Sequence, residues 1–136
     1  MQAIMPIMNV NFFDDPSEGP RAREDVRFNR LGLYVYPDLR RLAVGFDITP
    51  FRERPSIEVR LTNAKGERAG ILTVVETLDH NFHLTLHLRD REPTDSYSVV
   101  AVLYYATPET GRTDVHTLTT TIDVTEGGQE YSVSGS

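Results

Sequence analysis

The sequence predicts an all-β protein: a two-layer antiparallel sandwich of about seven strands, immunoglobulin-like, with an extra strand in an N-terminal arm. Alternating apolar and polar residues recur in short segments, and turn residues separate these segments about every 8 to 12 residues. No segment keeps a helical period over three turns. Residues 97–105 are largely apolar on both faces, which indicates a central strand between two layers.

Seven segments are the expected strands: 26–36, 40–48, 56–61, 68–77, 81–89, 97–105 and 114–124. The turn residues 63–66 should join the third and fourth segments as an antiparallel hairpin. In the fifth segment, apolar residues alternate strictly with polar ones, which predicts one buried face and one solvent-exposed face. The apolar members of that segment are Phe82, Leu84, Leu86 and Leu88.

The chain of 136 residues is long enough for one domain with its own core. We expect this domain at 26–124, after an N-terminal arm and linker at 1–25. Residues 125–136 are rich in glycine and serine and are expected to be a flexible tail, in which Tyr131 to Val133 pairs at most briefly.

The start of the sixth segment resembles a known family. Its motif Pro93-Thr-Asp-Ser-Tyr97-Ser-Val99 is similar to the Pro-x-x-x-Tyr-x-Val pattern of fibronectin type III domains and, more loosely, to the tyrosine corner of immunoglobulin-like domains. The resemblance implies that the Tyr97 ring packs under the crossing loop and that its hydroxyl reaches a backbone group. The tryptophan and cysteines typical of these families are absent, and the motif brings no catalytic residue.

Composition argues against several classes of partner. The net charge is −6, Lys65 is the sole lysine, and the arginines are scattered among acidic residues, so no basic stripe for nucleic acid is present. No segment approaches the roughly 20 apolar residues of a membrane span, so we expect no membrane contact. The absence of cysteine fits a reducing, cytoplasmic location; an export signal removed by processing is the alternative left open.

Candidate metal ligands are few. On a strand, His83 and His87 lie about 13 Å apart, too far to share one metal ion, so both should be exposed and free of transition metal. A zinc site built from His83, His116 and a carboxylate is the less favoured alternative. The segment Asp90-Arg-Glu92, with Tyr97, is similar to a calcium-binding segment of cadherin repeats, which implies a calcium alternative at this loop.

The N-terminal arm carries the predicted partner-binding residues. Met8, Val10 and Phe12 alternate with asparagines in a strand pattern, and a polar linker follows at 13–20. Exposed apolar side chains of this kind are expected to dock, either on their own domain or on the sheet edge of another subunit.

These observations predict a non-enzymatic structural or protein-interaction module that binds a protein partner or itself through the arm. No nucleophile elbow, phosphate loop or other catalytic or cofactor motif is present. The alternative is a module that binds a small ligand, carbohydrate or calcium, near Tyr34, Tyr36, Tyr104 and Tyr105.

Overall fold

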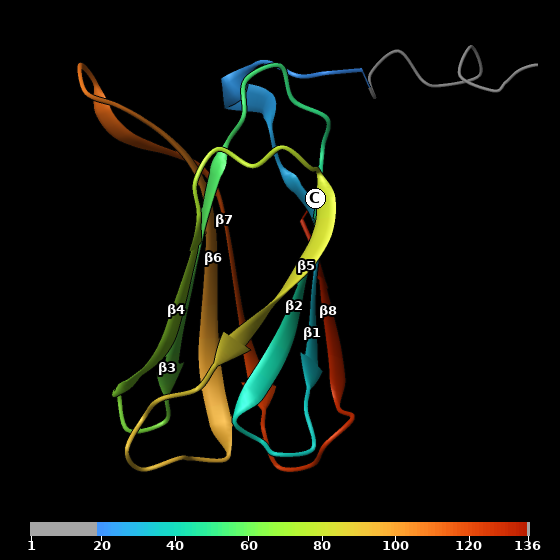
Figure 1. Ribbon diagram of the computed structural model, residues 1–136, viewed down its shortest axis with the longest axis vertical. Helices are drawn as coiled ribbons and strands as arrows, with labels where there is room; N and C mark the ends of the chain where they lie inside the picture. The colour runs from blue at the N-terminus through green and yellow to red at the C-terminus, as the bar shows by residue number, and fades with distance from the viewer. Residues whose placement is uncertain (1–18, 136) are drawn as a thin grey trace, which may run out of the picture.

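The computed structural model describes residues 19–135, which form two four-stranded antiparallel sheets packed face to face (Figure 1). The predicted all-β sandwich is confirmed. Its strands are β1 (Phe28–Val35), β2 (Arg41–Ile48), β3 (Ser56–Asn63), β4 (Arg68–Val74), β5 (Asn81–His87), β6 (Ser96–Thr107), β7 (Gly111–Asp123) and β8 (Glu130–Ser134). A single 3-10 turn, η4 (Arg23–Asp25), precedes them. Within this range no helix has the length and hydrophobicity of a membrane span.

The strand order is β5-β2-β1-β8 in the first sheet and β4-β3-β6-β7 in the second. Hairpins join β1 to β2, β3 to β4 and β6 to β7, and β5 crosses from the second sheet to the first. The β3–β4 turn closes as predicted, because Gly66 has a φ of 85° and donates its N–H to the carbonyl of Asn63 at 3.0 Å. A positive φ is inexpensive only for glycine, so this residue fits the turn.

The core lies between the inward faces of the two sheets. One face of β6 points inward and is buried without exception, with Tyr97, Val99, Ala101, Leu103 and Tyr105. On the outer face Val102 is also buried, and the ion pair of Arg112 with Glu58 lies on the same face. This outer face is only partly covered, because Val100 and Tyr104 are half-buried and Ser98 is exposed.

The C-terminal segment is a strand, and the expectation of a flexible tail at 125–136 was wrong. β8 pairs antiparallel with β1 and extends the first sheet by one strand. Gly128 makes the turn possible with a φ of 90° and donates its N–H to the Val35 carbonyl at 2.7 Å. Tyr131 and Val133 face inward and pack on the core. β8 is five residues long and is flanked by glycine and serine, so its alternating pattern is too short to distinguish a strand from a flexible tail in the sequence.

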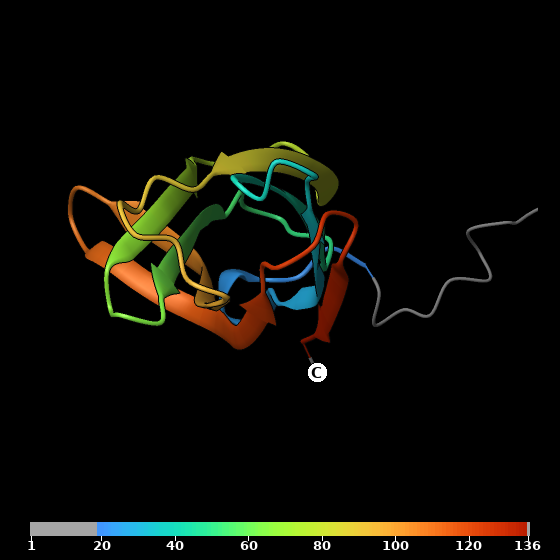
Figure 2. The same cartoon turned by 90° about the horizontal axis from the view of Figure 1, so that it is seen from below.

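The two sheets approach each other most closely where β5 ends beside β4. Figures 1 and 2 show β5 running obliquely across this side of the sandwich toward β4. The Arg89 N–H donates to the Ala69 carbonyl at 2.7 Å, which links the two edges directly. A Cβ at Gly70 would lie 2.6 Å from Leu86 Cδ2 and 3.1 Å from the His87 carbonyl oxygen, so glycine is required here by close approach.

Gly70→Ala is expected to lower the free energy of unfolding by about 1–3 kcal/mol, the usual cost of overpacking, because the His87 backbone must move. Gly45→Ala is the matched control, since a Cβ at Gly45 meets no atom closer than 4.0 Å. Urea unfolding of both variants measures the difference. Equal midpoints for the two would mean that β4 and β5 are not in close contact.

Candidate protein-binding surface

Exposed large apolar residues are concentrated in one stretch of the described chain. Four of the five, Ile71, Val75, Leu78 and Leu84, lie in β4, in the β4–β5 connection or in β5, with exposed fractions of 50%, 71%, 76% and 37%. The fifth is Tyr34 in β1. Single exposed apolar residues are normal on a protein surface, and these four do not share one face, because Ile71 lies opposite the exposed Arg60 on the outer face of the second sheet. Leu84 is different, because it belongs to the inward face of its strand.

The predicted burial of the apolar face of β5 holds at its C-terminal end and fails at Leu84. Leu86 is buried, as is Leu88 just beyond the strand, whereas the side chain of Leu84 is more than a third exposed. Its cross-strand neighbour Val44 is fully buried. The difference arises because β2 lies within the sheet, whereas β5 is an edge strand with no strand covering its free side.

We use the name β4–β5 wedge for the inward-facing side chains of the two edge strands that are not fully buried, namely Leu72 and Val74 on β4 and Phe82 and Leu84 on β5. Leu72 and Val74 are half-buried on β4, and Phe82 is half-buried on β5 with its ring 5.0 Å from that of Phe46. β5 approaches β4 at the end where Gly70 contacts Leu86, and it lies away from β4 at the other end (Figure 1). Toward this other end the inward side chains of the two strands are half-buried or exposed, whereas Leu86, near Gly70, is buried.

The closed end of the wedge is basic. A groove of about 330 Å³ lies there, lined by β4 residues from Arg68 to Leu72 and by β5 residues and Arg89. Among residues 19–135 neither Arg68 nor Arg89 forms an ion pair, whereas six of the other eleven arginines do. The surface therefore combines apolar side chains, a free strand edge and two guanidinium groups without an ion-pair partner in this range.

The predicted partner-binding residues Met8, Val10 and Phe12 lie outside the described residues. The described chain begins at Gly19 and is attached to the sandwich at Arg21, which bridges to Phe51 and donates its N–H to the Pro50 carbonyl at 3.0 Å. This attachment lies at the same end of the sandwich as the β4–β5 connection (Figure 1). The described chain thus begins at the end of the sandwich where β4 and β5 lie apart (Figure 1).

The loop considered for calcium holds a buried carboxylate that is already hydrogen-bonded. The Asp90 side chain is fully buried; its Oδ2 accepts from the Tyr97 hydroxyl at 2.8 Å and from Asn63 Nδ2 at 2.9 Å, and its Oδ1 accepts from Arg40 Nη1 at 3.1 Å. Burial opposes ionisation, but these hydrogen bonds outweigh it and lower the pKa of Asp90. Glu92 pairs with Lys65 at 2.5 Å. A calcium ion would have to displace these donors.

Tyr97 is buried at the entry to β6, as expected, and its hydroxyl contacts both a backbone group and a side chain. The hydroxyl donates to the Asp90 carboxylate at 2.8 Å, which is the shorter of the two hydrogen bonds. The Thr94 N–H donates to the same hydroxyl at 3.4 Å. Burial, reinforced by the nearby Asp90 charge, raises the pKa of Tyr97. The motif predicted the position of the ring, whereas its acceptor depends on the loop that precedes β6.

The histidines are spread over the two sheets. His83 and His87 are exposed on β5, as predicted, at one edge of the first sheet. His116 lies on β7 in the second sheet, next to the opposite side of the sandwich, where its Nδ1 accepts the Phe28 N–H at 2.9 Å. The structure does not bring His83 and His116 together, and no cluster of three potential metal ligands occurs among residues 19–135.

Stability is expected to fall when His116 becomes protonated. Burial, and secondarily the charge of Arg27, lowers the pKa of His116 below its usual value near 6.5. The unfolded chain therefore binds this proton more tightly, so the stabilisation is complete above about pH 6.5 and is lost as the pH falls from there to the folded-state pKa. Urea unfolding at several pH values should show this loss in the wild type and a smaller one in His116→Gln. The same pH dependence in both proteins would contradict it.

The tyrosines proposed as a ligand platform differ in accessibility. Tyr105 is buried, donates its hydroxyl to the Glu53 carbonyl at 2.8 Å and has its pKa raised to about 12, mainly by burial. Arg112 lies over the Tyr104 ring at 4.0 Å, and Arg41 lies over the Tyr36 ring at 4.5 Å. Of the four tyrosines only Tyr34 is exposed, so they do not form one aromatic platform for a ligand.

Comparison with protein-family models, with curated proteins and with solved structures found no match in any of the three. The function is therefore argued from the residues and their arrangement.

Proposed function

We propose that this protein is a non-enzymatic interaction module that self-assembles, with the arm of one copy adding a strand to the free edge of β5 in a second copy. The observation that carries the proposal is the β4–β5 wedge, where Leu84 belongs to the inward face of a sandwich strand and yet remains exposed. A strand placed beside β5 would cover Leu84, Phe82 and, on β4, Leu72.

The sequence of the arm suits such an addition. A strand that joins a sheet edge gains main-chain hydrogen bonds, and its alternate side chains enter the pockets that give specificity. Met8, Val10 and Phe12 would face the wedge, while Asn9 and Asn11 would face solvent. Burial of three such side chains contributes about 5 kcal/mol, which corresponds to a dissociation constant of about 0.2 mM. The cost of association opposes this gain and the main-chain hydrogen bonds add to it, so we expect a dissociation constant on the order of 0.1 mM.

Charge favours a second copy over the arm's own domain. Asp14 and Asp15 follow the apolar residues of the arm, and Arg68 and Arg89 lie at the closed end of the wedge. In one chain, the four residues from Gly19 to Asp15 span at most about 14 Å. The strand β4 alone is about 20 Å long, and the described chain begins at the end of the sandwich where β4 ends, opposite its first residue, Arg68 (Figure 1). Asp14 and Asp15 of the same chain therefore cannot reach Arg68, whereas those of a second copy are not limited by this distance.

We further propose that the sandwich is immunoglobulin-like. Strands β1, β2 and β5 share one sheet and β3, β6 and β7 share the other, which is how immunoglobulin-like domains divide their strands A, B, E and C, F, G. The tyrosine at the entry to the sixth strand supports the same assignment.

Sedimentation equilibrium over about 10 to 500 μM protein tests the self-assembly. We expect the full chain to show a concentration-dependent dimer or larger oligomer, and both deletion of residues 1–18 and Leu84→Glu to shift it to monomer. Leu78→Glu is the matched control, because Leu78 is more exposed than Leu84 but lies in the connecting loop outside the wedge. This variant should associate like the wild type.

A full-length protein that stays monomeric over this range would overturn self-assembly. If deletion of 1–18 instead lowered the unfolding midpoint of a monomer, the arm would bind its own domain. Equal loss of association in Leu84→Glu and Leu78→Glu would exclude the wedge as the specific binding surface.

A further inference from the structure

A second surface, on the outer face of the first sheet, carries features of a ligand site. Two glycines, Gly32 in β1 and Gly45 in β2, are direct cross-strand neighbours in the two central strands of this sheet. His83 of β5 lies beside Gly45, and Ser132 of β8 lies beside Gly32. This row forms the middle of a depression of about 570 Å³, which we call the glycine trough.

Neither glycine is required by the fold. A Cβ at Gly32 would come no closer than 4.0 Å to the Tyr131 carbonyl oxygen, and a Cβ at Gly45 no closer than 4.0 Å to the Gly32 carbonyl oxygen. Both have ordinary strand φ angles, unlike the turn glycines. Glycine weakens a strand relative to alanine, because it loses more conformational freedom and packs no side chain. What the two glycines provide is an open floor on a sheet face.

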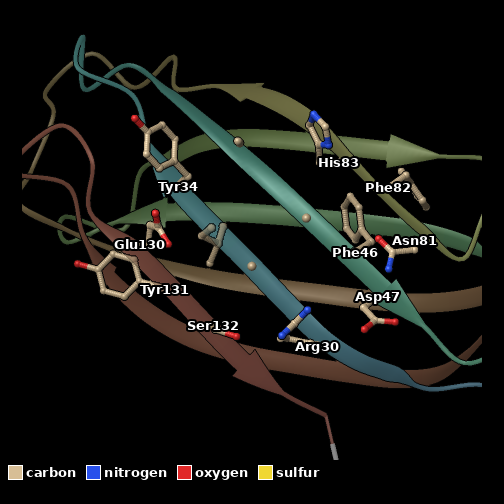
Figure 3. Close-up of a pocket in the computed structure, with 14 residues that line it drawn as sticks. Arg30, Tyr34, Phe46, Asp47, Asn81, Phe82, His83, Glu130, Tyr131 and Ser132 are labelled. Carbon is tan, nitrogen blue, oxygen red and sulfur yellow. The ribbon is translucent and has the colours of Figure 1, made fainter.

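Polar side chains surround this floor on all sides (Figure 3). Arg30, Asp47 and Asn81 are cross-strand neighbours at one end of the trough. Tyr34 and Glu130 are cross-strand neighbours at the other end. Among residues 19–135, the one side-chain hydrogen bond of these groups is a long one, from Asn29 to Asp47 at 3.4 Å. Their donors and acceptors are therefore free to contact a ligand.

The chemistry of the lining selects among ligand classes. Two carboxylates, of Asp47 and Glu130, face one guanidinium, of Arg30, so the trough does not favour an anion. The carboxylates lie at opposite ends and cannot share a metal ion. Adjacent hydroxyls of a sugar donate to carboxylates and accept from guanidinium or amide groups at the same time. The exposed ring of Tyr34 offers an apolar surface to the C–H face of a pyranose.

We infer that the glycine trough binds a neutral oligosaccharide. Its volume lies within the range of about 300 to 1,000 Å³ typical of small-molecule sites. The trough is shallow and open, so the affinity should be weak, with a dissociation constant on the order of 1 mM. The trough lies on the outer face of the first sheet, whereas the wedge residues belong to the inward face, and Phe82 is the one residue that lines both. The variants that test the trough leave Phe82 unchanged, so their outcome does not bear on self-assembly.

NMR titration of the amide-labelled full chain tests the site, with cellohexaose, maltohexaose, xylohexaose and mannohexaose as neutral probes up to about 10 mM. A heparin-derived hexasaccharide serves as the anionic comparison. We expect at least one neutral probe to shift the amides of Gly32, Gly45 and Ser132. Gly45→Val fills the floor and should weaken this binding at least tenfold, with an unfolding midpoint equal to or above that of the wild type.

Thr119→Val, on the outer face of the other sheet, is the control and should bind like the wild type. The inference is overturned if none of the four neutral probes shifts the trough amides, if Gly45→Val binds with unchanged affinity, or if only the heparin fragment binds there. Asp47→Ala gives an independent check, since it should weaken binding without filling the floor.

Discussion

Replacement of Asp90 by alanine is expected to lower the free energy of unfolding by about 2–4 kcal/mol. The substitution removes the acceptor of two buried donors, the Tyr97 hydroxyl and Asn63 Nδ2, and each unsatisfied buried group costs about 1–3 kcal/mol. The contribution of Arg40 is smaller, because its side chain is 36% exposed and solvent screens its charge. Chemical denaturation at neutral pH measures the loss.

Tyr97→Phe is the matched comparison for Asp90→Ala. It removes one donor to the carboxylate and should cost less, about 1.5–3 kcal/mol for a hydrogen bond to a charged group. The double variant should cost less than the sum of the two single changes, because both remove the same bond. Strictly additive costs would contradict the hydrogen bond between Tyr97 and Asp90.

Deletion of residues 125–136 is expected to lower the free energy of unfolding by at least about 3 kcal/mol. The deletion uncovers the free edge of β1 and removes two side chains, Tyr131 and Val133, that pack on the core, where full burial is worth about 1.5–3 kcal/mol each. It also removes the paired hydrogen bonds between the Tyr131 hydroxyl and the backbone of Asp123. Thermal unfolding of the truncated chain measures this effect.

Truncation separates the two interpretations of the C-terminus. An unchanged unfolding midpoint would mean that 125–136 is the flexible tail suggested by its composition. Val133→Asp in the full chain is a milder check, because it keeps the backbone of β8 and buries a charge against the core. It should be destabilising, whereas the neighbouring outward change Ser132→Asp should have little effect.

Much of the fold could be predicted from local sequence. In a strand that is buried on one face, apolar and polar residues alternate, and turn residues mark where the strand ends. All seven predicted strands are present, and the residues that share one face of β6 and the hairpin after Asn63 were predicted correctly. These features depend on neighbours close in the chain.

The errors concern neighbours that are distant in the chain. Leu84 has the same local pattern as Leu86, and its exposure depends on β5 being an edge strand that diverges from β4. β8 becomes a strand because the edge of β1 is available to it. Asp90 is only seven residues from Tyr97, but the two other donors to its buried carboxylate, Arg40 and Asn63, are distant in the chain. The periodicity of a sequence contains no information on tertiary contacts between distant segments.

The glycine trough was not predicted for a related reason. An isolated glycine within a strand suggests a bulge or close backbone approach, which holds for Gly70 and not for Gly32 or Gly45. Their significance follows from the β1–β2 register, which places them side by side. A paired arrangement of strand glycines is visible only when the partner strand and its register are known.

Isotope-filtered NMR on an equimolar mixture of labelled and unlabelled full-length protein tests the proposed self-assembly most directly. If the arm of one copy adds to β5 of another, intermolecular NOEs will connect the side chains of Val10 and Phe12 with the methyl groups of Leu84 and the ring of Phe82. Intermolecular NOEs that are absent at a concentration of about 0.5 mM, or that connect the arm with surfaces other than the β4–β5 wedge, would contradict it.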